Sequence, residues 1–401
     1  MSDPDSVRAR IDAYNRGRRP QLIERKYTAM RADPFVFFRG TAHLFWSQWS
    51  TAAGTLNGAP LTWACGDLHL ENFGSYRGDN GLAYFDLNDF DEAALAPASA
   101  DPARFLTSAR LAGRALALDA AAIADLSTTF LDHYSGALAD GKARWIERAT
   151  STGMIRDLLR SVKLRTRQRL LGSRTAVSRG RRRLRIDGKR AFSLLAQERR
   201  SVKDCIHEFA ETERDPGFFD VIDVAGRIAG TGSLGVRRYV VLVRGKGGPD
   251  GQRLLDIKEA QASTLAANLG AAVVTQPRWR TEADRVVGVQ QRMQAVSPAL
   301  LRAISLSHGH FILRELQPSE DRLALGNWNG KLNRLRKVLG AMGHLTAWSQ
   351  LRSASRDGAA GADALIAFSR DKSARRELMS FARECANRVE ADWHEFTAAP
   401  S

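Results

Sequence analysis

The chain contains two neighbouring polar segments that lie among apolar stretches. The first reads Gly66-Asp67-Leu68-His69-Leu70-Glu71-Asn72-Phe73-Gly74, and the second reads Phe85-Asp86-Leu87-Asn88-Asp89-Phe90-Asp91-Glu92. Residues 61–65 and 82–85 are apolar and predict short buried strands, with a hairpin turn over residues 75–81. Asp, Asn and Gly favour turns for backbone reasons alone. A charged loop held between buried strands, however, is more often a functional site than a surface turn.

The polar residues of these segments have the chemistry that phosphoryl transfer requires. One carboxylate orients the acceptor and takes its proton, while an amide and a second carboxylate hold a magnesium ion. Mg²⁺ prefers oxygen ligands and usually keeps several waters, so few protein ligands suffice. We therefore predict Asp67 as the catalytic base and Asn72 and Asp86 as metal ligands. Asp89 and Asp91 are the alternative carboxylates, and Asp89 is included in the predicted metal site.

A glycine-rich segment lies farther along the chain and reads Gly230-Thr231-Gly232-Ser233-Leu234-Gly235. Alone, this pattern most often opens a helix in a dinucleotide-binding protein. Here residues 221–228 and 236–243 on its two sides are rich in β-branched residues and predict strands. Two strands joined by a glycine turn are typical of the hairpin that covers the phosphates of ATP in kinases. We expect its nucleotide contacts to come from Gly230, Thr231, Gly232, Ser233 and Gly235.

A third predicted strand, residues 254–258, ends in Lys258. In kinases a lysine on the strand after the glycine hairpin pairs with the nucleotide phosphates, so we predict that role for Lys258. The alternative is an ordinary exposed strand lysine.

The two motifs occur in an unusual order, because ordinary kinases place the glycine hairpin before the catalytic loop. The termini of compact domains often lie close together, so a circular permutation is the simplest explanation. We expect an α+β, protein-kinase-like, two-lobed fold that is circularly permuted. Residues 1–215 would form a helical catalytic lobe with a basic helical insertion, and residues 216–318 a β-rich nucleotide-binding lobe. Residues 319–401 would be helices that pack back on the catalytic lobe.

With these motifs the sequence resembles the bacterial family called domain of unknown function 2252. The resemblance rests on Arg25-Lys26-Tyr27 with Met30, residues 34–40, the two acidic segments, Gly230 to Gly235, Lys258-Glu259-Ala260, Arg285-Val286-Val287, and Arg314 with Leu316. That family looks like a distant branch of the protein-kinase-like superfamily, near aminoglycoside phosphotransferases and HipA-type kinases, with a similar Gly-Asp-x-His-x-x-Asn-Phe loop. The resemblance implies a catalytic role for His69 beside Asp67, and ATP and Mg²⁺ as cofactors.

Three positions raise questions about this pattern. After Arg314, residues 317–320 differ from the Gln and later Lys expected there. An acid should orient the lysine of the nucleotide site, and Glu259 and Glu282 are the nearby candidates. In the kinase-like relatives an Asp braces the catalytic loop. Asp101, followed by Pro102, could do so, but its position favours a helix N-cap.

Composition limits the class of protein. The chain has 401 residues, of which 44% are hydrophobic, and a formal net charge of +16. No apolar run reaches the roughly 18 residues of a transmembrane helix, and the N-terminus has no apolar signal region, so we expect no membrane association. Cys65, Cys205 and Cys385 are far apart and form no C-x-x-C pair. This spacing argues against a disulfide framework or a zinc site and fits the cytoplasm.

Positive charge is concentrated between Arg156 and Arg190, where the sequence contains fourteen Lys and Arg but only two Asp. Such a face could support non-specific nucleic-acid binding, or recognise an anionic acceptor or an acidic partner. It has no aromatic residue for base stacking. A solvated helix is the structural alternative.

These observations lead to one functional expectation and two alternatives. We expect an ATP- and Mg²⁺-dependent phosphotransferase that acts on an unidentified small-molecule or protein acceptor. One alternative is a non-catalytic, kinase-like nucleotide-binding protein whose basic face binds nucleic acid or an acidic partner. The other is AMP transfer on the same fold.

Overall fold

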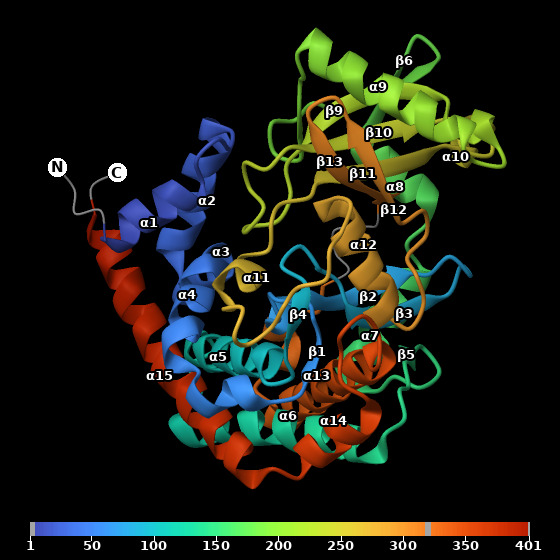
Figure 1. Ribbon diagram of the computed structural model, residues 1–401. Coiled ribbons are helices and arrows are strands. Elements are labelled where there is room, and N and C mark those ends of the chain that lie inside the picture. Colours follow the sequence, from blue (N-terminus) through green and yellow to red (C-terminus); the bar gives the residue numbers. More distant parts are fainter. Residues whose placement is uncertain (1–4, 317–321, 400–401) are drawn as a thin grey trace.

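A helical part and a sheet-containing part face each other in this molecule (Figure 1). The structure is a computed structural model that describes residues 5–316 and 322–399. The fold is mixed α+β, as the sequence predicted. Within the described ranges, no helix combines the length and apolar character that crossing a bilayer needs.

The N-terminal helices lead to the segment that carries the first polar motif. They are α1 (Val7–Tyr14), α2 (Pro20–Ala32), α3 (Pro34–Gly40), α4 (Ala42–Ala52) and the 3₁₀ turn η1 (Gly54–Gly58). The motif follows β1 (Leu61–Ala64), which pairs with β4 (Ala94–Pro97). It includes a 3₁₀ turn, η2 (Leu70–Asn72), and leads into a hairpin of β2 (Phe73–Arg77) and β3 (Ala83–Leu87). A two-residue strand, β5 (Ile146–Glu147), extends this hairpin on the β3 side.

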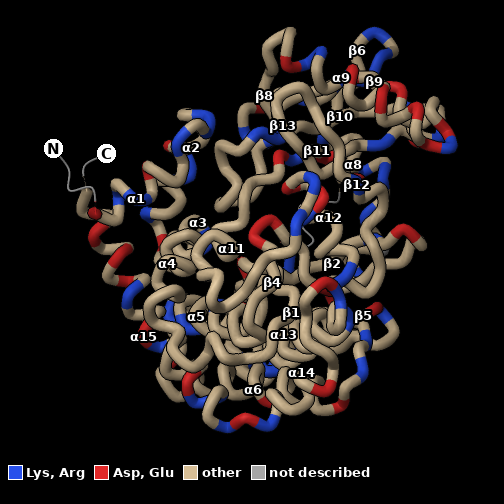
Figure 2. The backbone as a smooth tube through the Cα atoms, viewed as in Figure 1, with Lys and Arg blue, Asp and Glu red and all other residues tan. Residues whose placement is uncertain are grey.

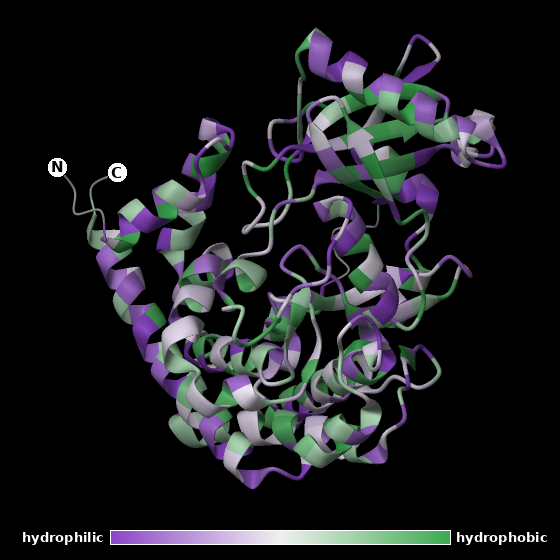
Figure 3. Ribbon diagram, in the orientation of Figure 1, coloured by the Kyte–Doolittle hydropathy of each residue, from purple (hydrophilic) through white to green (hydrophobic). Residues whose placement is uncertain are grey.

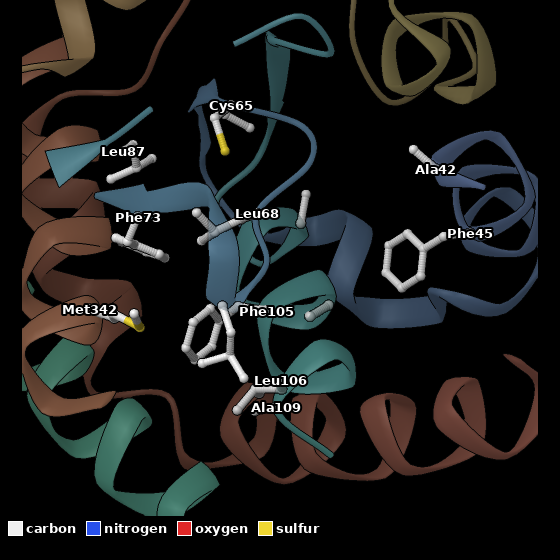
Figure 4. Close-up of a cluster of buried hydrophobic side chains, with 14 of the residues drawn as sticks. Ala42, Phe45, Cys65, Leu68, Phe73, Leu87, Phe105, Leu106, Ala109 and Met342 are labelled. Atoms are coloured by element: carbon white, nitrogen blue, oxygen red, sulfur yellow. The ribbon is translucent and has the colours of Figure 1, made fainter. Parts of the chain in front are cut away.

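The apolar residues of the motif anchor its polar ones. Leu68 and Phe73 are completely buried and point into a cluster with Phe105 and Met342 (Figure 4). Because these side chains are fixed in the core, the polar residues between them are held at the surface of that core.

The helical part is built from segments at both ends of the chain. Its helices are α5 (Ala100–Ala115), α6 (Ala120–Asp140), α7 (Gly153–Lys163), α13 (Leu332–Ser353), α14 (Ala362–Ser369) and α15 (Lys372–Ala398), and η5 (Leu325–Trp328) precedes α13. Helix α13 packs along α6, and α15 packs along α5. The two chain ends meet, since α1 contacts α15 and the Val7 amide donates to Glu395 Oε1 over 2.7 Å (Figure 1).

The other part is a six-stranded antiparallel sheet in the order β12-β13-β11-β10-β9-β8. Its strands are β8 (Ala191–Phe192), β9 (Val221–Arg227), β10 (Arg238–Val243), β11 (Arg253–Glu259), β12 (Arg302–Leu306) and β13 (Gly309–Glu315). The predicted strand, glycine turn and strand are confirmed as β9 and β10, which pair antiparallel. The strands are rich in apolar residues, as Figure 3 shows, because one face of the sheet and part of the other are covered.

Different elements cover the two faces. Helix α9 (Ala196–Glu211) covers one face, where Val202 and Ile206 pack with Tyr239 and Leu255. The basic segment covers part of the other with α8 (Arg167–Arg174), β6 (Thr175–Ser178) and β7 (Arg181–Leu184). The remaining elements are η3 (Pro216–Phe219), α10 (Gly248–Gly251), α11 (Thr264–Asn268) and α12 (Glu282–Met293).

These contacts differ from the expected division of the chain. Strand β8 and helix α9 belong to the sheet-containing part, which therefore begins before the expected boundary at residue 215. The expected boundary at residues 318/319 and the unusual residues 317–320 lie outside the described residues. In the described part of the C-terminal region, α13 and α14 pack on α6 and α15 packs on α5. Helices α14 and α15 are separate, and Asp371 caps the start of α15 by accepting hydrogen bonds from Ser373 N and Ala374 N.

Candidate active site

A polar cleft lies where the first polar segment, the predicted catalytic loop, meets the six-stranded sheet. It has two adjoining sections, which we name the outer and the inner cleft and which share five lining residues. The outer cleft encloses about 70 Å³ and is lined by Asp67, Asp91, Glu92, Tyr14, Arg18, Arg39 and the glycine turn. The inner cleft encloses about 330 Å³ and is lined by Asn72, Asp256, Lys258 and several arginines. His69, Asp89, Gly230, Ser233 and Arg322 line both sections. A larger cavity of about 600 Å³, beside α13, contains none of the predicted site residues.

The backbone at the start of the catalytic loop is held by Asp101 and by close packing. The Asp101 carboxylate accepts hydrogen bonds from Cys65 N over 2.9 Å and from Gly66 N over 3.0 Å. The prediction of Asp101 as a helix N-cap is therefore wrong, since Ser99 occupies that position and Asp101 braces the loop. Gly66 has φ +79°, and a Cβ there would lie 2.0 Å from the Glu92 carbonyl oxygen, so the position requires glycine.

Asp67 faces the outer cleft and forms an ion pair with a buried arginine. Arg104 donates from Nε to Asp67 Oδ1 over 2.7 Å, while the Asp67 side chain keeps 20% of its surface exposed. Burial raises the pKa of Asp67 to about 7; Arg104 opposes this rise, and Asp89 and Glu92 add to it. A carboxylate that titrates near neutral pH in a cleft is suited to accept a proton.

His69 lies beside Asp67 but is not arranged as a base. Its Nδ1 accepts a hydrogen bond from Glu71 N over 3.1 Å, so Nε2 carries the proton of the neutral ring and lies 4.0 Å from Asp67 Oδ2. Burial, together with Arg39 and Arg104, lowers the pKa of His69 well below its usual value. The neutral ring therefore has no free lone pair for a proton, and its Nε2 is too far from Asp67 for a direct hydrogen bond.

Asn72 joins the two polar segments. Its side-chain nitrogen donates to the backbone oxygens of Asp67 over 3.0 Å and Asp89 over 3.2 Å, and its side-chain oxygen accepts from Asn88 N over 3.3 Å. The amide thus fixes the separation of the carboxylates on the two loops.

Lys258 reaches from β11 to the second polar segment. Its Nζ forms an ion pair with Asp91 and lies 3.9 Å from Asp89 Oδ1. Burial opposes the ionisation of Asp89, but Lys258, the hydrogen bond from the Asp91 amide and two nearby arginines together outweigh it and lower the pKa of that carboxyl. The expected partners are engaged elsewhere, because Glu259 pairs with Arg237 and Glu282 with Arg285. The acid that orients Lys258 is therefore Asp91.

Asp86 lies apart from these residues. It is 1% exposed, accepts from Leu87 N over 2.9 Å and pairs with Arg352 of α13 at 3.3 Å. Neither section of the cleft has Asp86 among its described lining residues. The structure thus brings Asp67, Asn72, Asp89 and Lys258 together but not Asp86.

The glycine turn forms the roof of the outer cleft and is tied to the N-terminal helices. The Gly232 carbonyl accepts from Arg18 Nη1 over 2.9 Å and from Lys26 Nζ over 3.2 Å. A Cβ at Gly232 would lie 3.0 Å from the Arg39 carbonyl oxygen. Arg39 itself pairs with Glu71 at 2.7 Å, so it links the turn to the catalytic loop.

The sequence analysis did not predict a role in the cleft for several residues. Arg104 is the partner of Asp67, and Asp256 binds a cluster of arginines in the inner cleft. Asp256 and Lys258 are two residues apart on β11, and this alternation with Leu255 and Ile257 could have indicated a charged sheet face. Nothing in the spacing of the sequence indicated Arg104.

Part of the basic segment also reaches the cleft. Arg174 and Arg190 line the inner section. Others have structural contacts: Arg183 lies 3.8 Å from Asp223 of β9, and Arg185 donates to the carbonyl of Thr175 in β6 over 2.7 Å. Figure 2 shows Lys and Arg at the exposed turn beyond β6.

The family model that describes uncharacterised proteins conserved in bacteria, DUF2252, matches residues 18–399. The chain belongs to this family. The match includes both polar segments, the glycine turn and Lys258, and it confirms the family resemblance inferred from the motifs. Comparison with curated proteins and with solved structures returned no match.

Proposed function

We propose that this DUF2252 protein is an ATP- and Mg²⁺-dependent phosphotransferase that acts on a small-molecule or protein acceptor. The observation that carries the proposal is the meeting of Lys258 with Asp89 and Asp91, beside Asp67 and below the glycine turn. These are the groups that position phosphates, metal and acceptor in kinase-like enzymes.

The chain's own residues have distinct roles in this proposal. Asp67 accepts the proton of the acceptor, Arg104 holds its carboxylate in place, and Asn72 fixes the loop that carries Asp89. Lys258 and the backbone of the glycine turn hold the nucleotide phosphates. A binding protein without catalysis has no need of a cleft carboxylate with a pKa near 7, so Asp67 favours an enzyme.

The residues fit a magnesium ion bound together with substrate. Among the described residues, no group of three or more His, Cys, Asp or Glu side chains could hold a metal by itself. Mg²⁺ needs no such group, since one or two carboxylates, substrate phosphates and waters complete its shell. Asp89 fits because it is ionised and its side chain is 45% exposed, and Asp91 lies beside it. When bound, Mg²⁺ would neutralise charge on the phosphates.

The order of the elements supports a kinase-like fold that is circularly permuted. The glycine hairpin of β9 and β10 and the lysine of β11 follow the catalytic loop in the chain, whereas in ordinary kinases they precede it. The hydrogen bond from Val7 N to Glu395 Oε1 and the packing of α1 on α15 bring the chain ends together, as a permutation needs.

Calorimetric titration of ATP, with and without Mg²⁺, tests the proposal. The wild type should bind ATP in a magnesium-dependent manner, and Asp89→Asn should weaken this binding at least about tenfold, because it removes a charged ligand. Asp86→Asn is the matched control, since Asp86 is paired with Arg352 outside the cleft, and it should leave affinity unchanged. No ATP binding in any condition would overturn the proposed function.

A further inference from the structure

The cavity beside α13 lies apart from the polar cleft and has no role in the proposed function. It encloses about 600 Å³, and small-molecule sites typically enclose about 300–1,000 Å³. Its described lining shares no residue with either section of the cleft. The walls come from α6, from α13 and from the segment between β5 and the start of α7 (Figure 1).

Three of the lining side chains form a stack of aromatic rings. The ring centroids of His133 and His344 are 4.7 Å apart at an interplanar angle of 16°, and those of His344 and Trp348 are 5.1 Å apart at 18°. His344 and Trp348 are four residues apart on α13 and share one face of that helix, whereas His133 comes from α6. A fourth ring, that of Trp145, precedes β5 and keeps 53% of its surface exposed. Rings of this kind favour a flat aromatic ligand.

Glycines in the middle of α13 make this stack possible. A Cβ at Gly340 would lie 2.3 Å from Cδ2 of His133, and a Cβ at Gly343 would lie 2.4 Å from the Phe130 carbonyl oxygen. Glycine is unfavourable inside a helix, but here it lets α6 approach α13 closely and lets the His133 ring lie against the α13 backbone. The position of the rings is therefore fixed by the packing of two long helices.

The ring nitrogens of the stack are available for hydrogen bonds to a ligand. In the part of the chain that the structure describes, they have no protein hydrogen-bond partner in His133, His344 or Trp348. Burial, together with His133 and Arg144, lowers the pKa of His344 to about 4, and burial also lowers the pKa of His133. Both imidazoles are therefore mainly neutral at neutral pH, and a neutral imidazole offers one donor and one acceptor.

The charges around the cavity balance. Arg144 and Lys337 contribute positive charge to the lining and Glu147 contributes negative charge. Arg144 also pairs at 2.7 Å with Asp140, which is outside the described lining. With Asp140 included, two cations and two anions surround the cavity, so the site favours neither an anion nor a cation.

We propose that this cavity binds a small, uncharged, planar heteroaromatic molecule whose ring carries both a hydrogen-bond donor and an acceptor. The flat ring packs against the aromatic side chains, and its polar edge faces the nitrogens of the stack. The inference does not depend on the proposed function, because the cavity and the cleft have no described lining residue in common.

1H-Indazole is a suitable probe, because it is a flat, uncharged bicyclic ring with one N–H donor and one acceptor nitrogen. Its dissociation constant for the whole chain would be measured at neutral pH by ligand-observed NMR titration. Two further probes separate the required properties. ε-Caprolactam keeps a donor and an acceptor but is not aromatic, and 1H-indazole-3-carboxylate keeps the flat ring but adds a negative charge.

Two variants test whether the probe binds in this cavity. Ala341→Phe fills the cavity from α13, and Trp145→Ala removes the exposed ring. Because Trp145 is more than half exposed, its truncation leaves the core intact, and this variant gives a result even if Ala341→Phe does not fold. Ala121→Phe is the matched control for Ala341→Phe, since Ala121 is an exposed residue of α6 outside the described lining.

We expect the wild type to bind 1H-indazole at least about tenfold more tightly than the other two probes. Each cavity variant should lose at least about tenfold in affinity for 1H-indazole, while Ala121→Phe changes it less than about twofold. Absence of 1H-indazole binding to the wild type up to about 10 mM would overturn the proposal. Unchanged affinity in a folded cavity variant would also overturn it, because the probe would then bind elsewhere. Equal or tighter binding of ε-caprolactam or of the carboxylate would overturn the assignment to an uncharged aromatic ligand.

Discussion

Arg104 donates from Nε to Asp67 Oδ1 over 2.7 Å, and its guanidinium carbon lies 4.1 Å from the centre of the Phe38 ring. Arg104 is fully buried, while Asp67 stays partly exposed to the cleft. The pair fixes one carboxylate oxygen and leaves Oδ2 near His69 and the outer cleft. Because the two residues are 37 positions apart and Arg104 lies outside the loop motif, only the folded chain reveals this pair.

The first prediction concerns the base. Asp67→Asn should lower turnover about 10²–10⁴-fold, because the amide cannot accept the acceptor's proton, while ATP affinity stays within about twofold. Product release from ATP and calorimetric titration measure the two quantities. His69→Gln is the comparison: its ring has no free lone pair, so we expect a loss below about tenfold. An equal loss in the two variants would contradict the assignment of the base.

The second prediction is the pH dependence of turnover. Because Asp67 acts only when ionised and its pKa is about 7, turnover should rise with pH and reach half of its maximum near pH 7. Arg104 lowers this pKa, so Arg104→Met should shift the midpoint to higher pH. Methionine keeps much of the packing against Phe38 and Phe45. A rate that does not change between about pH 6 and pH 8 would rule out a base with this pKa.

Sequence patterns predicted the helices, strands and turns near the motifs well, because each pattern depends on residues that are close together in the chain. The segments on both sides of Gly230 to Gly235 are rich in β-branched residues and form the predicted hairpin, and Lys258 follows on the next strand. Asp67 and Asn72 could likewise be found, since the apolar residues that anchor their loop lie next to them in sequence.

Partners brought together by folding were not predictable from spacing. The choice among Asp86, Asp89 and Asp91 depends on where β3 ends: Asp86 lies inside the strand and turns to Arg352, whereas Asp89 and Asp91 follow it and reach Lys258. The sequence offered Glu259 and Glu282 as partners of the lysine because they are near it in the chain. The acid that actually pairs comes from a loop far away in sequence, and cross-sheet and cross-loop contacts of this kind need the tertiary structure.

The third prediction concerns the brace of the catalytic loop. Asp101→Asn leaves one acceptor oxygen for the two amides of Cys65 and Gly66, so one buried amide loses its partner. We expect the free energy of unfolding to fall by about 1–3 kcal/mol and turnover to fall more than ATP affinity, because Asp67 shifts. Denaturant titration and kinetics measure these effects. Asp119→Asn is the control, since Asn caps a helix about as well as Asp and Asp119 only caps α6. Equal stability of the two variants would show that Asp101 does not hold the loop.

The fourth prediction tests the tight contact between the two polar segments. Gly66→Ala places a Cβ against the Glu92 carbonyl oxygen at a backbone position with φ +79°, so both steric overlap and a left-handed conformation oppose it. We expect a loss of about 3 kcal/mol or more in the free energy of unfolding, measured by denaturant titration. Gly54→Ala is the matched control, because Gly54 also has positive φ, at +50°, but no atom within 4 Å of the added Cβ. That variant should lose only about 1–2 kcal/mol, the cost of the conformation alone. If the two substitutions cost the same, the contact between Gly66 and Glu92 does not position the catalytic loop, and Asp67 must be held by other contacts, such as those with Arg104 and Asn72.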